Sequence, residues 1–328
     1  MRKISFFLKL LLLVFLQGVS RNAYGGQAVV GGVMMKGPTH YTVCLNTLDG
    51  VHTKVFKHRS LTKRYKILGI PILRGMVMLV EMMFVGYKTI DYSARVAIAD
   101  EEKKELNEQK TDKGTSSKAS VDEVSKASAW LLVGTLIISL IFAIFLFKFL
   151  PLGIASLVDR IFDLSSIVVN IIDGVIRAAI FILYIYAIGK YKDVQDLFSY
   201  HGAEHKTINC YESGKTLTRK NIMASSQVHL RCGTTFLFVV LFLSLLVYLF
   251  IPSSLSFIYK LLLRLALLPV IAGIAYELQR FSAKQKTGLL QKLMRPGLWL
   301  QALTVNAPTL KHVRAGKASL EALIVAEK

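Results

Sequence analysis

The chain has 328 residues, 53% of them hydrophobic, and its mean hydropathy of +0.48 is too high for an ordinary water-soluble domain. The formal net charge of +20 is better explained by basic loops facing anionic lipid than by nucleic-acid binding, because no Lys/Arg-rich tract is interleaved with aromatic residues. Three scattered cysteines, Cys44, Cys210 and Cys232, form no Cys-x-x-Cys pair, which argues against a disulfide framework and favours a reducing compartment.

Residues 1–20 have the pattern of a signal peptide or a short membrane anchor. Basic residues precede the apolar run Leu10–Leu16, and Ala23-Tyr24-Gly25 supplies small residues of the kind found at a cleavage site. Residues 20–75, however, contain nine Lys or Arg and the single acid Asp49, which predicts that this segment stays in the cytoplasm. We therefore favour an apolar N-terminal extension over a cleaved signal.

Residues 21–66 are interpreted as a small cytoplasmic β unit. The stretch 24–38 is rich in glycine and reads as a kinked strand, because it lacks the Gly-x-x-x-x-Gly-Lys-Ser/Thr pattern of a phosphate-binding loop. Alternating apolar residues on both sides of Asp49-Gly50 predict a β-hairpin. The nearby histidines are interpreted as solvated strand residues rather than ligands: His40, His52 and His58.

Residues 67–99 predict a helix that lies at the membrane interface or packs under the transmembrane bundle. The segment is apolar, yet Glu81, Lys88 and Arg95 recur every seven residues and so share one stripe of a helix, which a lipid-facing span would resist. Residues 100–128 are rich in Glu, Lys, Ser and Asp and lack apolar periodicity. We expect them to form a flexible linker at a domain boundary.

Residues 129–277 predict a transmembrane bundle. Four segments are apolar enough to cross a membrane: 129–150, 167–189, 234–252 and 257–276. Lys and Arg concentrate in the connector 190–233 and in the tail 278–328, whereas the other connectors are short and poor in them. This asymmetry predicts an α-helical integral membrane protein of about four spans in two hairpins, with the connector, the tail and other helical segments in the cytoplasm.

The connector 190–233 contains the stretch with the clearest chemistry, His201-Gly-Ala-Glu204-His205. Two histidines four residues apart share one face of a helix and can hold one metal ion, with the glutamate on the same side. His-x-x-Glu-His is the inverted form of the zinc-protease helix motif, in which the glutamate is the general base. Downstream, His229 and Cys232 offer another imidazole and a thiol.

The residues alone leave the ligand set open. His201, His205 and His229 are expected to bind one divalent ion, and either Glu212 or Cys232 would complete the shell. Such nitrogen and sulfur donors suit zinc, while manganese or iron would fit if carboxylates dominate. If Glu212 is a ligand, the catalytic base is Glu204. The alternative is that these histidines hydrogen-bond to lipid phosphate or to neighbouring carboxylates and bind no metal.

Five motifs in the same order resemble the YqhQ-like family, bacterial membrane proteins with a domain of unknown function that are catalogued as predicted metal-dependent enzymes. They are Tyr24-Gly-Gly-Gln-Ala-Val, Gly32-Val-Met-Met-Lys-Gly-Pro, His201-Gly-Ala-Glu-His-Lys-Thr-Ile, Arg231-Cys-Gly-Thr and Pro296-Gly-Leu-Trp-Leu-Gln. The resemblance runs from about Gly25 to the C-terminus. It implies a multi-pass protein of the bacterial inner membrane and brings no established substrate.

The resemblance also marks what is unusual in this chain. Members usually begin near the Gly-Gly-Gln motif, which implies that residues 1–20 are an extension from a start codon placed too early. Gly31 and Ala307 stand where the family pattern has glutamates. Their loss puts catalysis in question, while the histidine cluster is intact.

Three functions remain compatible with these patterns. The first is a metal-dependent hydrolase that cleaves a peptide or lipid-linked bond at the cytoplasmic membrane face. The second is a non-catalytic scaffold or assembly factor whose basic face holds protein partners or membrane lipids. The third is a transporter, supported only by Asp173 and Arg177 inside a span, and it is least favoured because no repeats or broken helices are evident.

Overall fold

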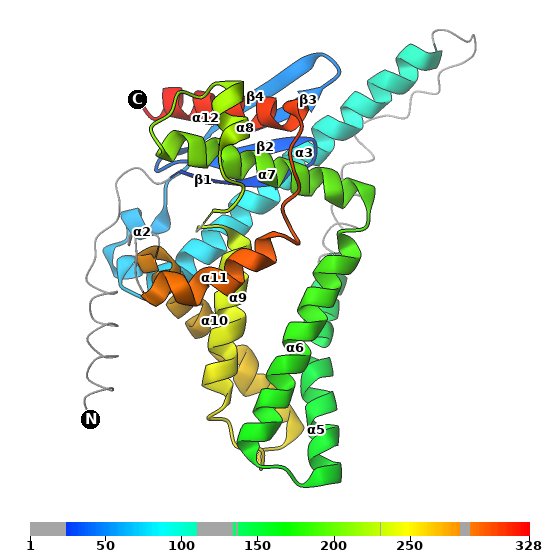
Figure 1. The fold of residues 1–328 in the computed structure, drawn as a ribbon, viewed down its shortest axis with the longest axis vertical. Helices are drawn as coiled ribbons and strands as arrows, with labels where there is room; N and C mark the ends of the chain where they lie inside the picture. Colours follow the sequence, from blue (N-terminus) through cyan, green and yellow to red (C-terminus); the bar gives the residue numbers. More distant parts are fainter. Residues whose placement is uncertain (1–23, 110–133, 136, 230, 283–288) are drawn as a thin grey trace. The chain divides into compact units, whose positions relative to one another are not determined.

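The computed structural model describes residues 24–109, 134–135, 137–229, 231–282 and 289–328 (Figure 1). These residues are mostly helical, with one small antiparallel sheet, and they divide into two compact units. The first unit draws on Met1–Glu101, Ile185–Leu243 and Leu268–Lys328, and the second on Glu102–Tyr184 and Ser244–Leu267. The His201 motif therefore belongs to the same unit as the N-terminal sheet, and not to the unit that contains most of the expected bundle.

The sheet is a four-stranded antiparallel meander in the order β1-β2-β3-β4. Its strands are β1 (Gly25–Val29), β2 (Gly32–Lys36), β3 (His40–Thr47) and β4 (Gly50–Lys57). The hairpin predicted at Asp49-Gly50 is confirmed, since Thr47 pairs with Gly50. The kinked strand expected for 24–38 is instead two strands, because Gly31 adopts a φ of 71° and reverses the chain between them.

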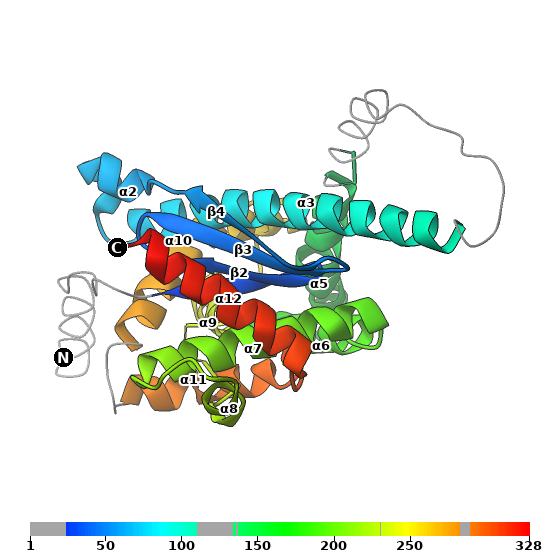
Figure 2. The ribbon, with the colours of Figure 1, turned by 90° about the horizontal axis from the view of Figure 1, so that it is seen from above.

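Both faces of the sheet are covered by helices of the same unit (Figure 2). Successive side chains of a strand point to opposite faces. Met34, Val43 and Leu45 pack with Val85 of α3 (Leu73–Gln109). On the other face, a second set packs with α7 (Lys192–Glu212) and α12 (Leu310–Ala326), and it includes Val33, Met35 and Cys44.

Helix α3 covers most of the segment 67–99 in which a helix is expected, but with different bounds. It begins at Leu73, after a short α2 (Leu61–Arg64) and a 3-10 turn η1 (Lys66–Gly69), and it continues to Gln109, past the boundary expected at residue 100. The rest of the expected linker, 110–128, lies outside the described residues. Glu81 does not share an exposed stripe with Lys88 and Arg95. Its side chain is buried, accepting a hydrogen bond from Ser60 Oγ at 3.2 Å and another from the amide of Leu61.

Among the residues that the structure describes, three helices are long and apolar enough to cross a membrane, whereas four spans are expected. They are Ile137–Phe162, which includes a π-helical turn η2 (Phe145–Phe149) and α5 (Leu150–Phe162), α6 (Ser166–Ile188) and α10 (Phe257–Ser282). The helix α9 (Gly233–Tyr248) is apolar but has only 16 residues. It ends shortly before Ile251-Pro252, where a helix is disfavoured because proline restricts the residue that precedes it. Two further helices lie in the first unit, α8 (Arg219–Ala224) and α11 (Leu289–Gln301).

The end of α12 is fastened to the sheet through the carboxylate of Glu327. Its Oε1 accepts the backbone amides of Thr39 at 2.8 Å and His40 at 2.7 Å. Burial raises the pKa of this carboxyl, but the two amides outweigh burial and hold the pKa below its ordinary value of 4.5. The carboxylate therefore stabilises the fold above that ordinary value, and the contribution is lost as the pH falls through the lower folded-state pKa.

We expect Glu327→Gln to lower the free energy of unfolding by about 1–3 kcal/mol at neutral pH, because hydrogen bonds to a charged group are weakened. The difference from the wild type should shrink at about pH 4 or below, where the wild-type carboxylate is itself becoming protonated. Thermal unfolding in detergent at several pH values measures both effects.

Glu321→Gln on the same helix is the matched control, because the side chain of Glu321 is 50% exposed and pairs only with Lys317 at 3.7 Å among the described residues. It should unfold like the wild type at every pH. An equal loss in both variants would mean that the Glu327 contacts contribute nothing specific.

Candidate metal centre

The helix α7 presents the motif because one of its faces is anchored in the core. Tyr200 and Ile208 pack with residues of the sheet and of α12. Gly316 of α12 allows a close approach, since a Cβ atom there would lie 2.8 Å from Thr207 Oγ1. The helix ends at Glu212, and Gly214 follows with a φ of 69°. The predicted helical spacing of the motif is thus present, on a buried helix rather than in an open loop.

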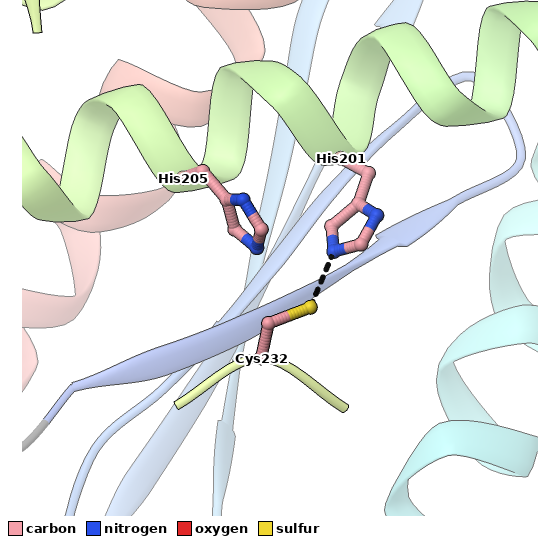
Figure 3. A group of neighbouring side chains, drawn as sticks. All are labelled: His201, His205 and Cys232. Atoms are coloured by element: carbon pink, nitrogen blue, oxygen red, sulfur yellow. Dashed lines mark hydrogen bonds between the residues drawn. The ribbon is translucent and has the colours of Figure 1, made fainter. Parts of the chain in front are cut away.

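Three possible metal donors meet on one side of α7 (Figure 3). His201 and His205 extend from the helix toward Cys232, which directly precedes α9. Donor atoms of the three residues all lie within 4.8 Å of one another. Cys232 Sγ is 3.2 Å from Nε2 of His201, and the centroids of the two imidazole rings are 4.4 Å apart.

Backbone carbonyls fix the tautomer of both rings. Nδ1 of His201 lies 2.9 Å from the carbonyl oxygen of Thr304, and Nδ1 of His205 lies 2.5 Å from that of Gln227. A carbonyl oxygen only accepts, so each Nδ1 carries the hydrogen and donates it. Burial also lowers the pKa of His205. In the neutral imidazoles Nε2 is therefore the unprotonated nitrogen, as metal ligation requires.

Glutamine side chains hold the segment that carries Cys232. Gln301 accepts the amide of His229 at 3.1 Å and donates to its carbonyl at 2.6 Å. Gln279 donates to the carbonyl of Cys232 at 2.9 Å, and Gln227 donates to the carbonyl of Asn306 at 2.8 Å. The position of the thiol relative to the two rings is therefore set by contacts from helices α10 and α11 and from the segment before α12.

Glu204 lies beside the donors and is buried, with 3% of its surface exposed. Its Oε2 is 3.5 Å from Nε2 of His205. Burial raises the pKa of Glu204, and the nearby His201, His229 and Arg231 oppose that rise, as does the amide of Gly26. A raised pKa makes a carboxylate a better proton acceptor than one in solvent.

The other two expected ligands face each other rather than the three donors. His229 Nε2 lies 3.7 Å from Oε2 of Glu212, although its ring centroid is 5.6 Å from that of His205. Glu212 is also paired with Arg231. Burial alone raises the pKa of Glu212, but His229 and Arg231 outweigh burial and hold the pKa below its ordinary value. Of the two alternatives for completing the shell, Cys232 lies with the histidines and Glu212 does not.

The three clustered donors fit a zinc ion by their chemistry. Zinc binds imidazole nitrogen and thiolate at about 2.0–2.3 Å in a tetrahedral arrangement, which places neighbouring donors roughly 3.3–3.8 Å apart. The spacing of the donors needs only small side-chain movements to meet this requirement. Ligating histidines commonly donate their second ring nitrogen to a carbonyl, as both rings do here.

Several supporting residues were not assigned a role from the sequence. Thr304 and Gln301 fall in or near a family motif, but nothing local in the sequence links them to His201 or His229. Neither position that lacks an expected glutamate belongs to the three clustered donors. Gly31 forms the β1–β2 turn, and the exposed Ala307 follows Asn306.

The contact of Glu204 with β1 requires glycine at position 26. A Cβ atom at Gly26 would lie 2.8 Å from Glu204 Cγ and 2.6 Å from the carbonyl oxygen of Met34, whereas one at Gly25 would meet nothing within 4 Å. We expect Gly26→Ala to lower the free energy of unfolding by about 1–3 kcal/mol through this overlap. Gly25→Ala, the matched control, should have little effect in the same thermal unfolding assay, and equal effects of both substitutions would contradict the proposed packing.

Comparison with known proteins agrees with the family inferred from the motifs. No solved structure matches the chain. The chain is 32% identical over 304 residues to the uncharacterized protein YqhQ of Bacillus subtilis (strain 168). The aligned region covers 92% of each of the two chains. Residues 70–326 match the family described as "Protein of unknown function (DUF1385)", a range that includes all three clustered donors. The chain therefore belongs to this family.

Proposed function

We propose that this protein is a membrane-associated metal-dependent enzyme, and that it is a hydrolase. The observation that carries the proposal is a pair of imidazoles that donate from Nδ1 to backbone carbonyls and lie with Cys232 in one group of donor atoms within 4.8 Å of one another. Two nitrogen donors and one sulfur donor leave a tetrahedral ion with one open position, which distinguishes catalytic from structural zinc sites. The buried carboxyl of Glu204 beside the donors adds a proton acceptor.

The residues have separable roles in this proposal. His201, His205 and Cys232 would hold zinc, which supplies a Lewis acid when bound. The carbonyls of Thr304 and Gln227 orient the two imidazoles. Glu204 accepts a proton from attacking water and later returns it to the leaving group, and the Gly26 amide holds its carboxylate in place. His229 and Arg231 position Glu212 at the edge of the site.

Metal analysis tests this proposal before any substrate is known. Full-length protein purified in detergent should contain about one zinc ion per chain, and His205→Ala should lose most of it, because one of three protein donors is removed. Glu204→Gln should keep the metal, and with a substrate in hand it should have no measurable turnover.

His52→Ala is the control, since His52 lies on the outer strand β4 and contacts Tyr92 rather than the three donors. Substoichiometric metal in the wild type, unchanged in His205→Ala, would return these histidines to a structural role and favour the scaffold. Full activity of Glu204→Gln would leave the metal site intact but remove Glu204 as the base.

We also propose that the metal centre faces the cytoplasm of a bacterial cell, at the inner membrane. The support is the concentration of Lys and Arg in 190–233 and 278–328. Reporter fusions after Lys215 and after Lys317 should both give a cytoplasmic signal. A periplasmic signal from either fusion would contradict this orientation.

A further inference from the structure

The second unit contains a largely buried cluster of four charged residues around one tyrosine, and the proposed enzyme does not use it. We call it the cation cluster: Lys148, Asp173, Arg177, Tyr248 and Arg264. Its members come from η2, α6, α9 and α10. Asp173, Arg177 and Arg264 are 1%, 3% and 2% exposed, so their charges are removed from solvent by protein alone.

One carboxylate is shared between two guanidinium groups. Arg177 donates to Oδ2 of Asp173 and, from Nη1, to Ser244 Oγ at 2.7 Å. Arg264 places Nη1 2.7 Å from Asp173 Oδ1, an ion pair without hydrogen-bond alignment, and donates from Nη2 to Asn170 Oδ1 at 2.6 Å. The Nε atoms of both arginines are buried and have no hydrogen-bond partner among the described residues.

The ring of Tyr248 lies at the centre of three positive charges. The charged ends of Arg177, Arg264 and Lys148 are 4.9, 5.1 and 5.3 Å from its centroid. Lys148 Nζ also lies 3.4 Å from Tyr248 Oη, whose hydrogen is donated to the carbonyl of Arg264 at 2.9 Å. Within the part of the chain that the structure describes, Asp173 is the one carboxylate within ion-pair distance of Arg177 and Arg264.

Local backbone geometry places Lys148 in this cluster. Pro151 lacks the amide that would bond to the carbonyl four residues earlier, and the helix just before it widens into a π-helical turn in which the amide of Leu150 bonds to the carbonyl of Phe145. Lys148 lies in that turn and is only partly buried. Among the three cations of the cluster it is the one whose side chain is not fully buried, whereas Arg177 and Arg264 are.

The charge count calls for an anion. Arg177 and Arg264 share one carboxylate, which leaves an excess of one positive charge, or two when Lys148 is protonated, in a region of low dielectric constant. An unpaired charge is costly there. Arg177 lies at the midpoint of the 23-residue α6, one of the three candidate spans, so a lipid headgroup would have to leave the interface to reach it. A doubly charged ion loses more hydration energy on burial than a singly charged one.

We propose that the cation cluster binds a small singly charged inorganic anion of the halide or nitrate class. Lys148 is its accessible partner, and the two arginines supply the positive field. Asp173 competes with the anion for the arginines and keeps them in place when no anion is bound. The site is independent of the metal centre, because all its residues belong to the second unit.

The test is anion-dependent thermal stability of full-length protein in a zwitterionic detergent. Chloride, bromide or nitrate is titrated against gluconate at constant ionic strength, since gluconate is too large for such a site. A bound anion should raise the melting temperature in a saturable way. Lys148→Gln should weaken the apparent affinity roughly 10- to 100-fold, as expected for loss of a hydrogen bond to a charged group, while Lys148→Arg should retain binding.

Two further variants separate binding from folding. Arg160→Gln removes an exposed cation from the same helical run and should respond like the wild type. Asp173→Asn removes the competing carboxylate, so its apparent affinity for the anion should rise even if its stability falls. If the cluster is purely structural, these substitutions should change the melting temperature but not its dependence on the anion concentration.

Three results would overturn the proposal. One is a wild-type protein whose stability is the same in chloride, nitrate and gluconate. Another is a Lys148→Gln variant that folds and responds to anions like the wild type. If that variant does not fold, the corresponding result is an Asp173→Asn variant whose affinity for the anion is no greater than that of the wild type. The third is stabilisation seen only in nanodiscs with anionic lipid and absent with inorganic anions, which would assign the cluster to a lipid phosphate.

Discussion

Two hydrogen bonds from imidazole nitrogens to backbone carbonyls determine what the candidate metal centre could do. An imidazole that donates from Nδ1 has its lone pair on Nε2, and both rings of α7 are held in that state. Without these carbonyls each ring could rotate or exchange its proton, and the thiol of Cys232 would face a donor rather than an acceptor. The chemistry proposed for the site thus depends on main-chain atoms of Thr304 and Gln227, whose side-chain identity matters little for this purpose.

The carbonyls come from segments that are far from the motif in sequence. Thr304 is separated from His201 by 103 residues and Gln227 from His205 by 22. Glutamine side chains in turn hold these segments, and Gly26 in β1 supplies an amide to Glu204. The sheet, α7, the Cys232 segment and the stretch before α12 therefore act as one support, which explains why the family motifs are spread over the whole chain.

Features that depend on neighbouring residues could be predicted from the sequence. The Asp49-Gly50 hairpin and the common helix face of His201 and His205 follow from local turn chemistry and periodicity. The partners of the histidines could not be predicted in this way. Every residue has a backbone carbonyl, so the sequence does not show which carbonyl will face a given imidazole. The reversal at Gly31 was missed since glycine permits a bend without specifying one, and hydropathy alone could not show that α9 ends at Tyr248.

The packing of α12 bears on how the protein reaches its native state during synthesis. Thr42 Oγ1 in β3 donates to the carbonyl of Ser319 at 2.8 Å, a contact across 277 residues. The part of this face that packs against α12 is therefore covered only when the last helix has left the ribosome, after the candidate membrane helices have been made. An unfinished chain presents that face to the surrounding solution, so truncated products should be prone to aggregation and to capture by chaperones.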